Sequence, residues 1–79
     1  MDGSQAFVLI SVKIGKTVEV RDKLLQIPEV KEAYCVMGPY DISCRLEAEK
    51  PEEIPRIVLN SIHPIDGVTD TVTATVFTP

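Results

Sequence analysis

The sequence predicts an α+β fold in which two helices cover one face of a four-stranded antiparallel sheet. Hydrophobic periodicity gives the order strand, helix, strand, strand, helix, strand. A four-residue turn, Gly38 to Asp41, joins the middle two strands and is short enough for a hairpin. With 79 residues, the chain is long enough for one domain and too short for two.

The first strand is expected at Ala6 to Lys13, after a polar tail, residues 1–5, that we expect to be disordered. Its even-numbered side chains are aliphatic and predict the side that faces the core: Val8, Ile10 and Val12. Phe7 and Leu9 make the opposite face apolar as well, which is typical of a central strand.

Two amphipathic helices are expected. The first runs from Thr17 to Gln26, with an apolar stripe of Val20, Leu24 and Ile27. The second opens with the segment 49–53, whose acidic residues lie in its first turn, and its stripe consists of Ile54, Ile57, Val58 and Ile62. Because Pro55 lacks a backbone N–H, we expect the regular helix to begin late or to bend there.

The hairpin is expected to pair Val30 to Met37 with the strand that begins at Ile42. A four-residue loop would pair Met37 with Ile42 and would place Cys35 opposite Cys44. We expect both cysteines to be small, buried apolar residues with reduced thiols, and a disulfide between them remains the alternative. Two cysteines and one histidine do not complete a zinc site, so no metal site is predicted.

The last strand is expected at Gly67 to Phe77. Its aliphatic set is predicted to face the core: Val68, Val72, Ala74 and Val76. The opposite set consists of Thr69, Thr71, Thr73, Thr75 and Phe77. A threonine row suits a strand, and it also presents a ladder of hydroxyl groups.

The sheet face away from the helices is predicted to be too apolar to remain in water. Pairing two such faces in a dimer would cover it. The residues predicted to form this dimer interface are Phe7, Leu9, Tyr34, Val36, Thr75 and Phe77.

Composition argues against several classes of function. The formal charge is −4 and the eight basic residues are scattered, which argues against a nucleic-acid-binding surface. No apolar run is long enough to span a bilayer and no signal-peptide pattern is present, so a soluble cytoplasmic protein is expected. Neither a phosphate-binding glycine loop nor a nucleophile with a neighbouring base is recognisable, so no cofactor and no catalysis are predicted.

The turn at residues 38–41 carries a phenol and a carboxylate at a position where binding groups are often found. Two interpretations of Asp41 remain open: its carboxylate stabilises the turn by bonding its own backbone, or it takes part in binding a ligand.

Taken together, these segments resemble the ligand-binding (RAM) domain of the Lrp/AsnC regulators. The resemblance is carried by Ala6-Phe7-Val8-Leu9-Ile10, Ile27-Pro28-Glu29-Val30-Lys31-Glu32-Ala33, Gly38-Pro39-Tyr40-Asp41, and Gly67-Val68 with the threonine strand. It implies a single domain of residues 6–79 with a ferredoxin-like βαββαβ sandwich. It also implies a stand-alone form, without the helix-turn-helix of the full regulators.

The same resemblance implies dimers that form through the open sheet faces and assemble into an octamer-like ring. A free amino acid would bind between dimers near Gly38, Pro39, Tyr40 and Asp41, with Thr71 and Thr73 on a strand that helps to line the site. In that role Asp41 would bind the ammonium group of the amino acid, and Tyr40 would form a wall of the site. The ligand's carboxylate would be bound by the backbone at Gly38 or by the hydroxyls of Thr71 or Thr73. The expected function is therefore an amino-acid-binding regulatory domain of transcription. It would act through partners, including full-length regulators of the family.

Two alternative functions remain open. One is a small enzyme of the dimeric α+β barrel type, for which His63, the two cysteines and Tyr40 are the available groups. His63 precedes Pro64 at a helix end, where a capping or surface role is expected instead. The other is a structural subunit whose assembly binds no ligand.

Overall fold

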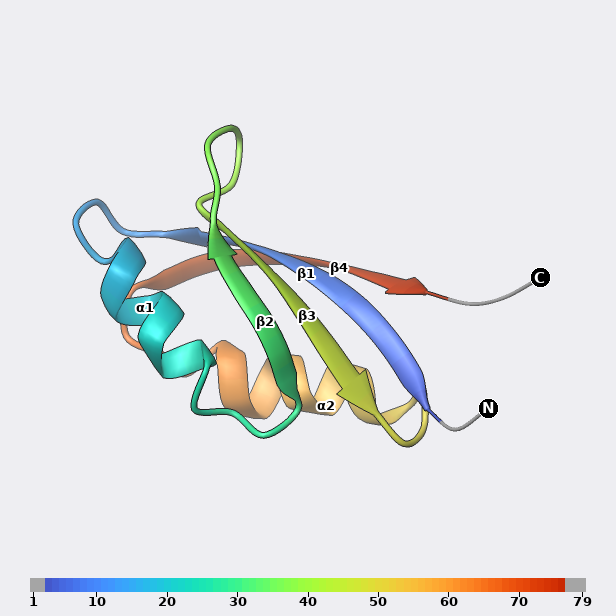
Figure 1. Cartoon of the computed structure of the whole chain (residues 1–79). Helices are drawn as coiled ribbons and strands as arrows, with labels where there is room; N and C mark the ends of the chain where they lie inside the picture. Colours follow the sequence, from blue (N-terminus) through green and yellow to red (C-terminus); the bar gives the residue numbers. More distant parts are fainter. Residues whose placement is uncertain (1–2, 77–79) are drawn as a thin grey trace.

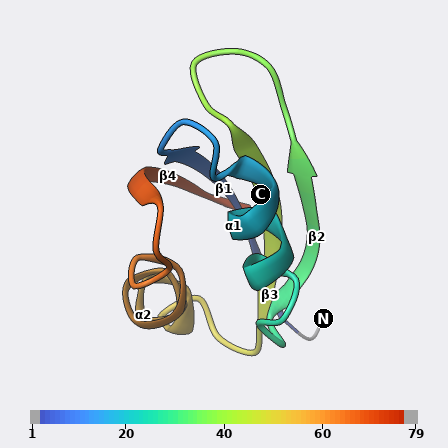
Figure 2. The same cartoon turned by 90° about the vertical axis from the view of Figure 1, so that its left-hand side faces the viewer.

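The computed structural model describes residues 3–76 (Figure 1). Its elements are β1 (Ser4–Val12), α1 (Thr17–Leu24), β2 (Val30–Cys35), β3 (Ile42–Ala48), α2 (Glu53–Ile57), η1 (Val58–Ile62) and β4 (Val68–Val76). The strand order is β2-β3-β1-β4, and each neighbouring pair is antiparallel. Figures 1 and 2 show the helices packed against one face of this sheet. The predicted ferredoxin-like sandwich is therefore confirmed.

The helix-covered face of the sheet and the apolar stripes of the helices form one core. Fully buried side chains come from the central strands and from both helical segments: Ala6, Val8, Ile10, Val20, Leu24, Ile42, Leu46 and Ile62. The predicted stripes are confirmed, because Ile54 and Val58 are also buried and Ile27 and Ile57 pack at the margin of the cluster. Within residues 3–76, no helix is long and apolar enough to cross a membrane.

β1 begins earlier than expected. Ser4 pairs with Ala48 and Gln5 pairs with Glu47, so both residues belong to the sheet. The expectation of a disordered tail is therefore wrong for these two residues, because backbone pairing with β3 extends the strand beyond its apolar segment. Residues 1 and 2 lie outside the described part of the chain.

The second helical segment starts late, as Pro55 predicts. α2 begins at Glu53, so Pro55 is the third helical residue. N–H groups in the first turn have no acceptor within the helix, so a proline there removes no hydrogen bond. η1 continues α2 as a π-helical segment, and His63 N–H donates to the carbonyl of Val58 five residues earlier, at 2.9 Å.

The hairpin register differs from the prediction by two residues. Cys35 pairs with Ile42, and Cys44 pairs with Ala33, so the two cysteines do not face each other. β2 ends at Cys35 because the chain leaves it to form a six-residue loop, closed by a 2.9 Å hydrogen bond from Val36 N–H to the carbonyl of Asp41. A shift of two residues keeps every side chain on its predicted face. Cys44 is buried as expected, whereas Cys35 is exposed, and both are free thiols.

The two faces of β4 are reversed relative to the prediction after its first residue. Val68 pairs with Val12 and packs against the core, but Asp70 then pairs with Ser11, which leaves Thr69 as an extra residue in a β-bulge. One inserted residue moves all later side chains to the opposite face. Three threonines of β4 pair with fully buried residues of β1 and therefore belong to the helix-covered side of the sheet: Thr71, Thr73 and Thr75. The predicted inward positions of Val72, Ala74 and Val76 are wrong.

The uncovered face of the sheet, called the open face below, is divided into two halves. On β1 and β4 lies an apolar strip of Phe7, Leu9, Val72, Ala74 and Val76, in which Phe7, Val72 and Val76 expose 43–44% of their surface. On β2 and β3 lies a charge cluster of Glu32, Arg45 and Glu47.

Only some of the residues predicted for the dimer interface lie on the open face. Phe7, Leu9 and Tyr34 lie on the open face as expected. Thr75 does not, because the bulge turns it toward the helices, and Val36 lies in the hairpin loop. Phe77 lies outside the described residues.

Candidate functional site

The hairpin loop is tied to the end of β1 through Asp41. The backbone N–H of Asp41 donates to the carbonyl of Ile10 at 2.9 Å, and its Oδ2 accepts a hydrogen bond from the backbone N–H of Val12, also at 2.9 Å. This carboxylate is half-buried and therefore stabilises the loop. The sequence predicted a carboxylate that bonds the backbone of its own turn, whereas the Asp41 carboxylate bonds the backbone of β1, and its ligand role stays a prediction. Within residues 3–76 its other oxygen, Oδ1, accepts no hydrogen bond, so a second role remains chemically available.

Above this anchor, the loop is open to solvent. Met37, Gly38 and Pro39 are exposed and Tyr40 is half-buried. Gly38 has φ +145°, a conformation that a side chain would strain. Figure 1 shows the loop projecting beyond the sheet, on the side away from the helices. The loop therefore presents backbone groups and a phenol above a fixed carboxylate.

The threonines predicted to share this site lie elsewhere in the chain. Thr71, Thr73 and Thr75 line a groove of about 380 Å³ between β4 and the second helical segment. The opposite wall is apolar and consists of Ile54, Pro55, Val58 and Leu59. None of residues 38–41 lines this groove, so a single chain does not bring the threonines and the hairpin loop into one cavity.

His63 belongs to the same groove, where its Nε2 lies 2.8 Å from the Thr71 hydroxyl. Sequence reasoning assigned His63 a surface role and did not connect it with the threonines. The available signal was its position at the end of a helix that leads directly into the threonine strand. The contact holds the imidazole against β4. Enzymes that use such a hydroxyl and base orient the base through a third group, and within residues 3–76 no second side-chain hydrogen bond orients His63.

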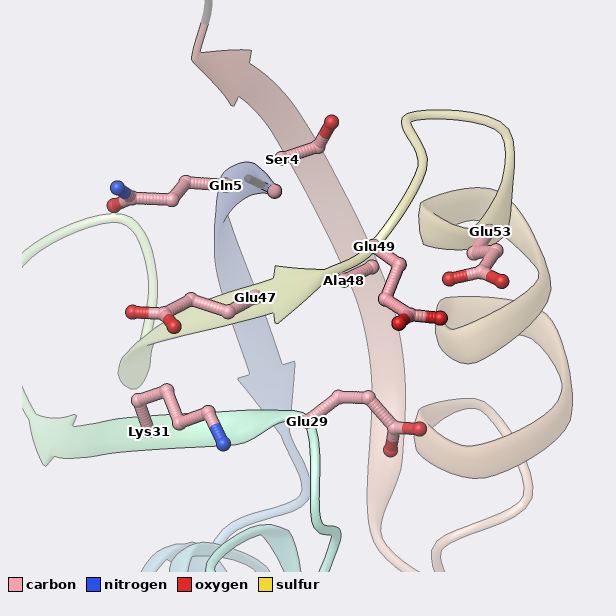
Figure 3. A pocket seen from close by; sticks show the side chains of 9 residues that line it. Ser4, Gln5, Glu29, Lys31, Glu47, Ala48, Glu49 and Glu53 are labelled. Carbon is pink, nitrogen blue, oxygen red and sulfur yellow. The ribbon is translucent and has the colours of Figure 1, made fainter. Parts of the chain in front are cut away.

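A second cavity, of about 700 Å³, lies at the end of the sheet where β3 ends (Figure 3). Its acidic side chains come from the segment before β2, from β3, from the connection after β3 and from α2: Glu29, Glu47, Glu49 and Glu53. Lys31 is the basic residue among those that line it. Within residues 3–76 no group of three or more histidine, cysteine or carboxylate side chains could hold a metal ion.

The two thiols differ chemically. Burial raises the pKa of Cys44 to about 11, while a hydrogen bond with the Val8 backbone opposes this shift. A buried thiol with a raised pKa is neutral at physiological pH and is a poor nucleophile. Cys44 is therefore a core residue rather than a reactive group.

Comparison with known proteins decides the family. The family model of the Lrp/AsnC ligand binding domain matches residues 5–78. This chain belongs to that family. The match covers every described element except Ser4, the first residue of β1, and confirms the resemblance found in the sequence.

Relatives of this RAM domain include transcription regulators. The chain is 39% identical over 66 residues to the HTH-type transcriptional regulator FL11 of Pyrococcus furiosus, a match that covers 84% of this chain and 43% of FL11. The chain spans about half the length of the curated regulators that it matches. A similar segment also occurs in the homocitrate synthase of Sulfurisphaera tokodaii, at 41% identity over 71 residues, which cover 86% of this chain and 15% of that enzyme.

Solved structures show the same fold. FFRP-DM1 superposes with a TM-score of 0.89 at 34% identity, covering 94% of this chain and 99% of that one. AsnC of E. coli superposes with a TM-score of 0.88 at 26% identity, covering 96% of this chain and 52% of AsnC. The regulator NMB0573 of Neisseria meningitidis, solved as a complex with L-Met, shares the fold at 22% identity, with a TM-score of 0.80 and coverage of 95% and 50%.

Proposed function

We propose that this RAM domain binds a free amino acid at its hairpin loop and transmits that binding through its assembly to transcription regulators. The observation that carries the proposal is the anchored carboxylate of Asp41, which keeps Oδ1 available beneath an exposed loop. The family supports it, because the relatives are regulators and NMB0573 was solved with an amino acid.

The chemistry of the loop suits a zwitterion. Oδ1 of Asp41 would accept a charge-assisted hydrogen bond from the ligand's ammonium group. The exposed backbone N–H of Gly38 would donate to the ligand's carboxylate, and Tyr40 would form one wall. Because Thr71 and Thr73 open into the groove beside η1, we assign their contribution to a neighbouring chain of the assembly.

The proposed assembly begins with a dimer through the open face. Its apolar strip leaves Phe7, Val72 and Val76 partly exposed in the single chain, and a second sheet would remove them from water. Dimers would then assemble into an octamer-like ring, with amino acids between them. We place this assembly in the cytoplasm, where it would meet full-length relatives, and assign no catalytic step to it.

A thermal-shift screen of the twenty amino acids, combined with light scattering, tests this function. A ligand at a hundred times its dissociation constant adds about 2.7 kcal/mol to stability, which such a screen detects. We expect at least one amino acid to raise the melting temperature and to change the assembled mass. A flat response to all twenty would contradict the proposal and would favour a ligand-free structural subunit.

The matched variants separate binding from folding at Asp41. Asp41→Asn keeps an oxygen that accepts from Val12 N–H but removes the charge needed by an ammonium group. We expect it to remain folded and assembled and to lose the ligand response. Thr71→Val and Thr73→Val report on the groove independently, and an unchanged response in Asp41→Asn would remove Asp41 from the site.

A further inference from the structure

The charge cluster on the open face differs from an ordinary surface ion pair. Arg45 Nη2 lies 3.0 Å from Glu32 Oε2, and Arg45 Nη1 donates to a carboxylate oxygen of Glu47. One cation therefore bridges two carboxylates from neighbouring strands, and the cluster keeps one surplus negative charge. Asp70, on the same face of β4, adds another.

The cluster lies directly beside the apolar strip. Arg45 is the β3 partner of Phe7 in the sheet, and Phe7 is the β1 partner of Ala74. Stacked sheets pack about 10 Å apart, so any second sheet that covers Phe7 also lies within reach of the cluster. The side chain of Arg45 is already only 22% exposed, so a covering sheet would remove much of the remaining water.

Removal of water from the interface increases the effect of the surplus charge on the free energy of association. In the single chain, exposed ion pairs contribute little to stability. Beneath a second sheet, a carboxylate that shares its cation would be partly desolvated and would face the charges of the partner. Two copies of this chain would each bring the surplus negative charge of their cluster, as well as the charge of Asp70, to one interface. A partner with a surplus positive charge would bring the opposite sign.

We propose that Glu32, Arg45 and Glu47 select the partner of the open face, favouring a RAM-type sheet face that carries one more basic than acidic side chain. This inference rests on the proposed dimer and adds its selectivity. The apolar strip contributes a hydrophobic attraction to every such partner, and the charge cluster makes the affinity depend on the charge of the partner. Self-pairing is thereby weakened relative to pairing with such a relative.

A series of isosteric variants tests the ranking. Arg45→Gln changes the cluster charge from −1 to −2, Glu47→Gln makes it neutral, and Glu32→Gln/Glu47→Gln makes it +1. Glu52→Gln changes the charge of the whole chain like Glu47→Gln does, but at an exposed position before α2, and serves as the control. Circular dichroism checks that each variant is folded.

Sedimentation equilibrium gives the dimer dissociation constant of each variant. We expect the constant to fall about three- to tenfold for Glu47→Gln and to rise by a similar factor for Arg45→Gln, with both differences shrinking at high salt. Native mass spectrometry of isotopically labelled wild type mixed with Glu32→Gln/Glu47→Gln should show mixed dimers as more than half of all dimers.

The possible results separate this inference from the proposed function. Equal dissociation constants across the series, or a statistical half of mixed dimers, would overturn the selective role and leave the dimer intact. A Glu52→Gln control that tightens the dimer as much as Glu47→Gln would also overturn it, because overall charge would then be the cause. A wild-type chain that stays monomeric would overturn both the dimer and the selection.

Discussion

The two faces of the sheet differ in the side chains that they present. The helix-covered face is uniformly apolar at its centre, with Ile10, Ile42 and Leu46 fully buried. The open face combines an apolar strip on β1 and β4 with a charge cluster on β2 and β3. The covered face therefore stabilises the fold of one chain, whereas the open face has the composition of an interface with a hydrophobic centre and a polar flank.

This difference shows how a thin domain can have a definite fold while one face of its sheet remains uncovered within the described residues. The covered face needs only apolar side chains of suitable volume, because the helices of the same chain supply its partners. The open face is not covered by any element within residues 3–76 (Figure 2), so a cover must come from outside this part of the chain. The predictions below test this division, beginning with the largest expected effect.

The covered face should dominate the stability of the single chain. Ile10→Ala removes part of a fully buried side chain, and we expect it to lower the free energy of unfolding by about 3 kcal/mol. Phe7→Ala, on the open face of the same strand, should cost the single chain much less. Urea denaturation of dilute protein measures both, and equal losses would show that the two faces do not differ in this way.

The buried thiol gives the covered face a pH dependence. Because burial raises the pKa of Cys44 from 9.0 to about 11, the unfolded chain ionises first as the pH rises. The free energy of unfolding should therefore be unaffected by this group below pH 9 and should fall by up to about 3 kcal/mol as the pH rises through 11.

Urea denaturation of wild type and Cys44→Ala across this range isolates the contribution of the thiol, since other titrating groups are common to both. In parallel, an alkylating reagent at neutral pH should modify exposed Cys35 quickly and Cys44 only on unfolding. Similar modification rates for the two thiols would show that the covered face opens readily.

Adjacent residues of β4 test where the open face lies. Val72→Asp places a charge in the apolar strip, and we expect the dimer dissociation constant to rise at least about tenfold. Thr73→Asp places the same charge on the helix-covered side, where it should leave the dimer unchanged. Sedimentation equilibrium measures both, and the reverse result would restore the face assignment made from the sequence.

The smallest effect is expected at the junction between the hairpin and β1. Asp41→Ala removes the acceptor of Val12 N–H and should lower the free energy of unfolding by about 1 kcal/mol. Asp41→Asn retains an acceptor and should lower it less. Thermal denaturation of the two variants without ligand provides the comparison, and equal stability of Asp41→Ala and wild type would show that the contact is not structural.

Some residues of the candidate sites could be identified from the sequence, and others could not. Asp41 could be identified from the sequence because a carboxylate in a turn has few roles, although its bond to Val12 could not. His63 was not connected with Thr71, because their contact depends on how η1 lies against β4. The charge cluster was also missed, since Glu32 joins Arg45 and Glu47 only through the pairing of β2 with β3.

The sequence by itself determined the order of elements, the helix stripes and the apolar side of β1, because these follow from local periodicity. The tertiary structure alone decided the register of the hairpin and the faces of β4. Asp41 pairs with β1, which lengthens the loop and shifts the register by two residues. Thr69 has no partner in β1, because Ser11 pairs with Asp70 and Val12 pairs with Val68. This β-bulge places the side chains of β4 after Thr69 on the opposite face of the sheet from the one predicted. The hairpin register and the β4 bulge both depend on backbone hydrogen bonds between segments that are distant in the sequence. Such bonds cannot be predicted from the periodicity of side chains.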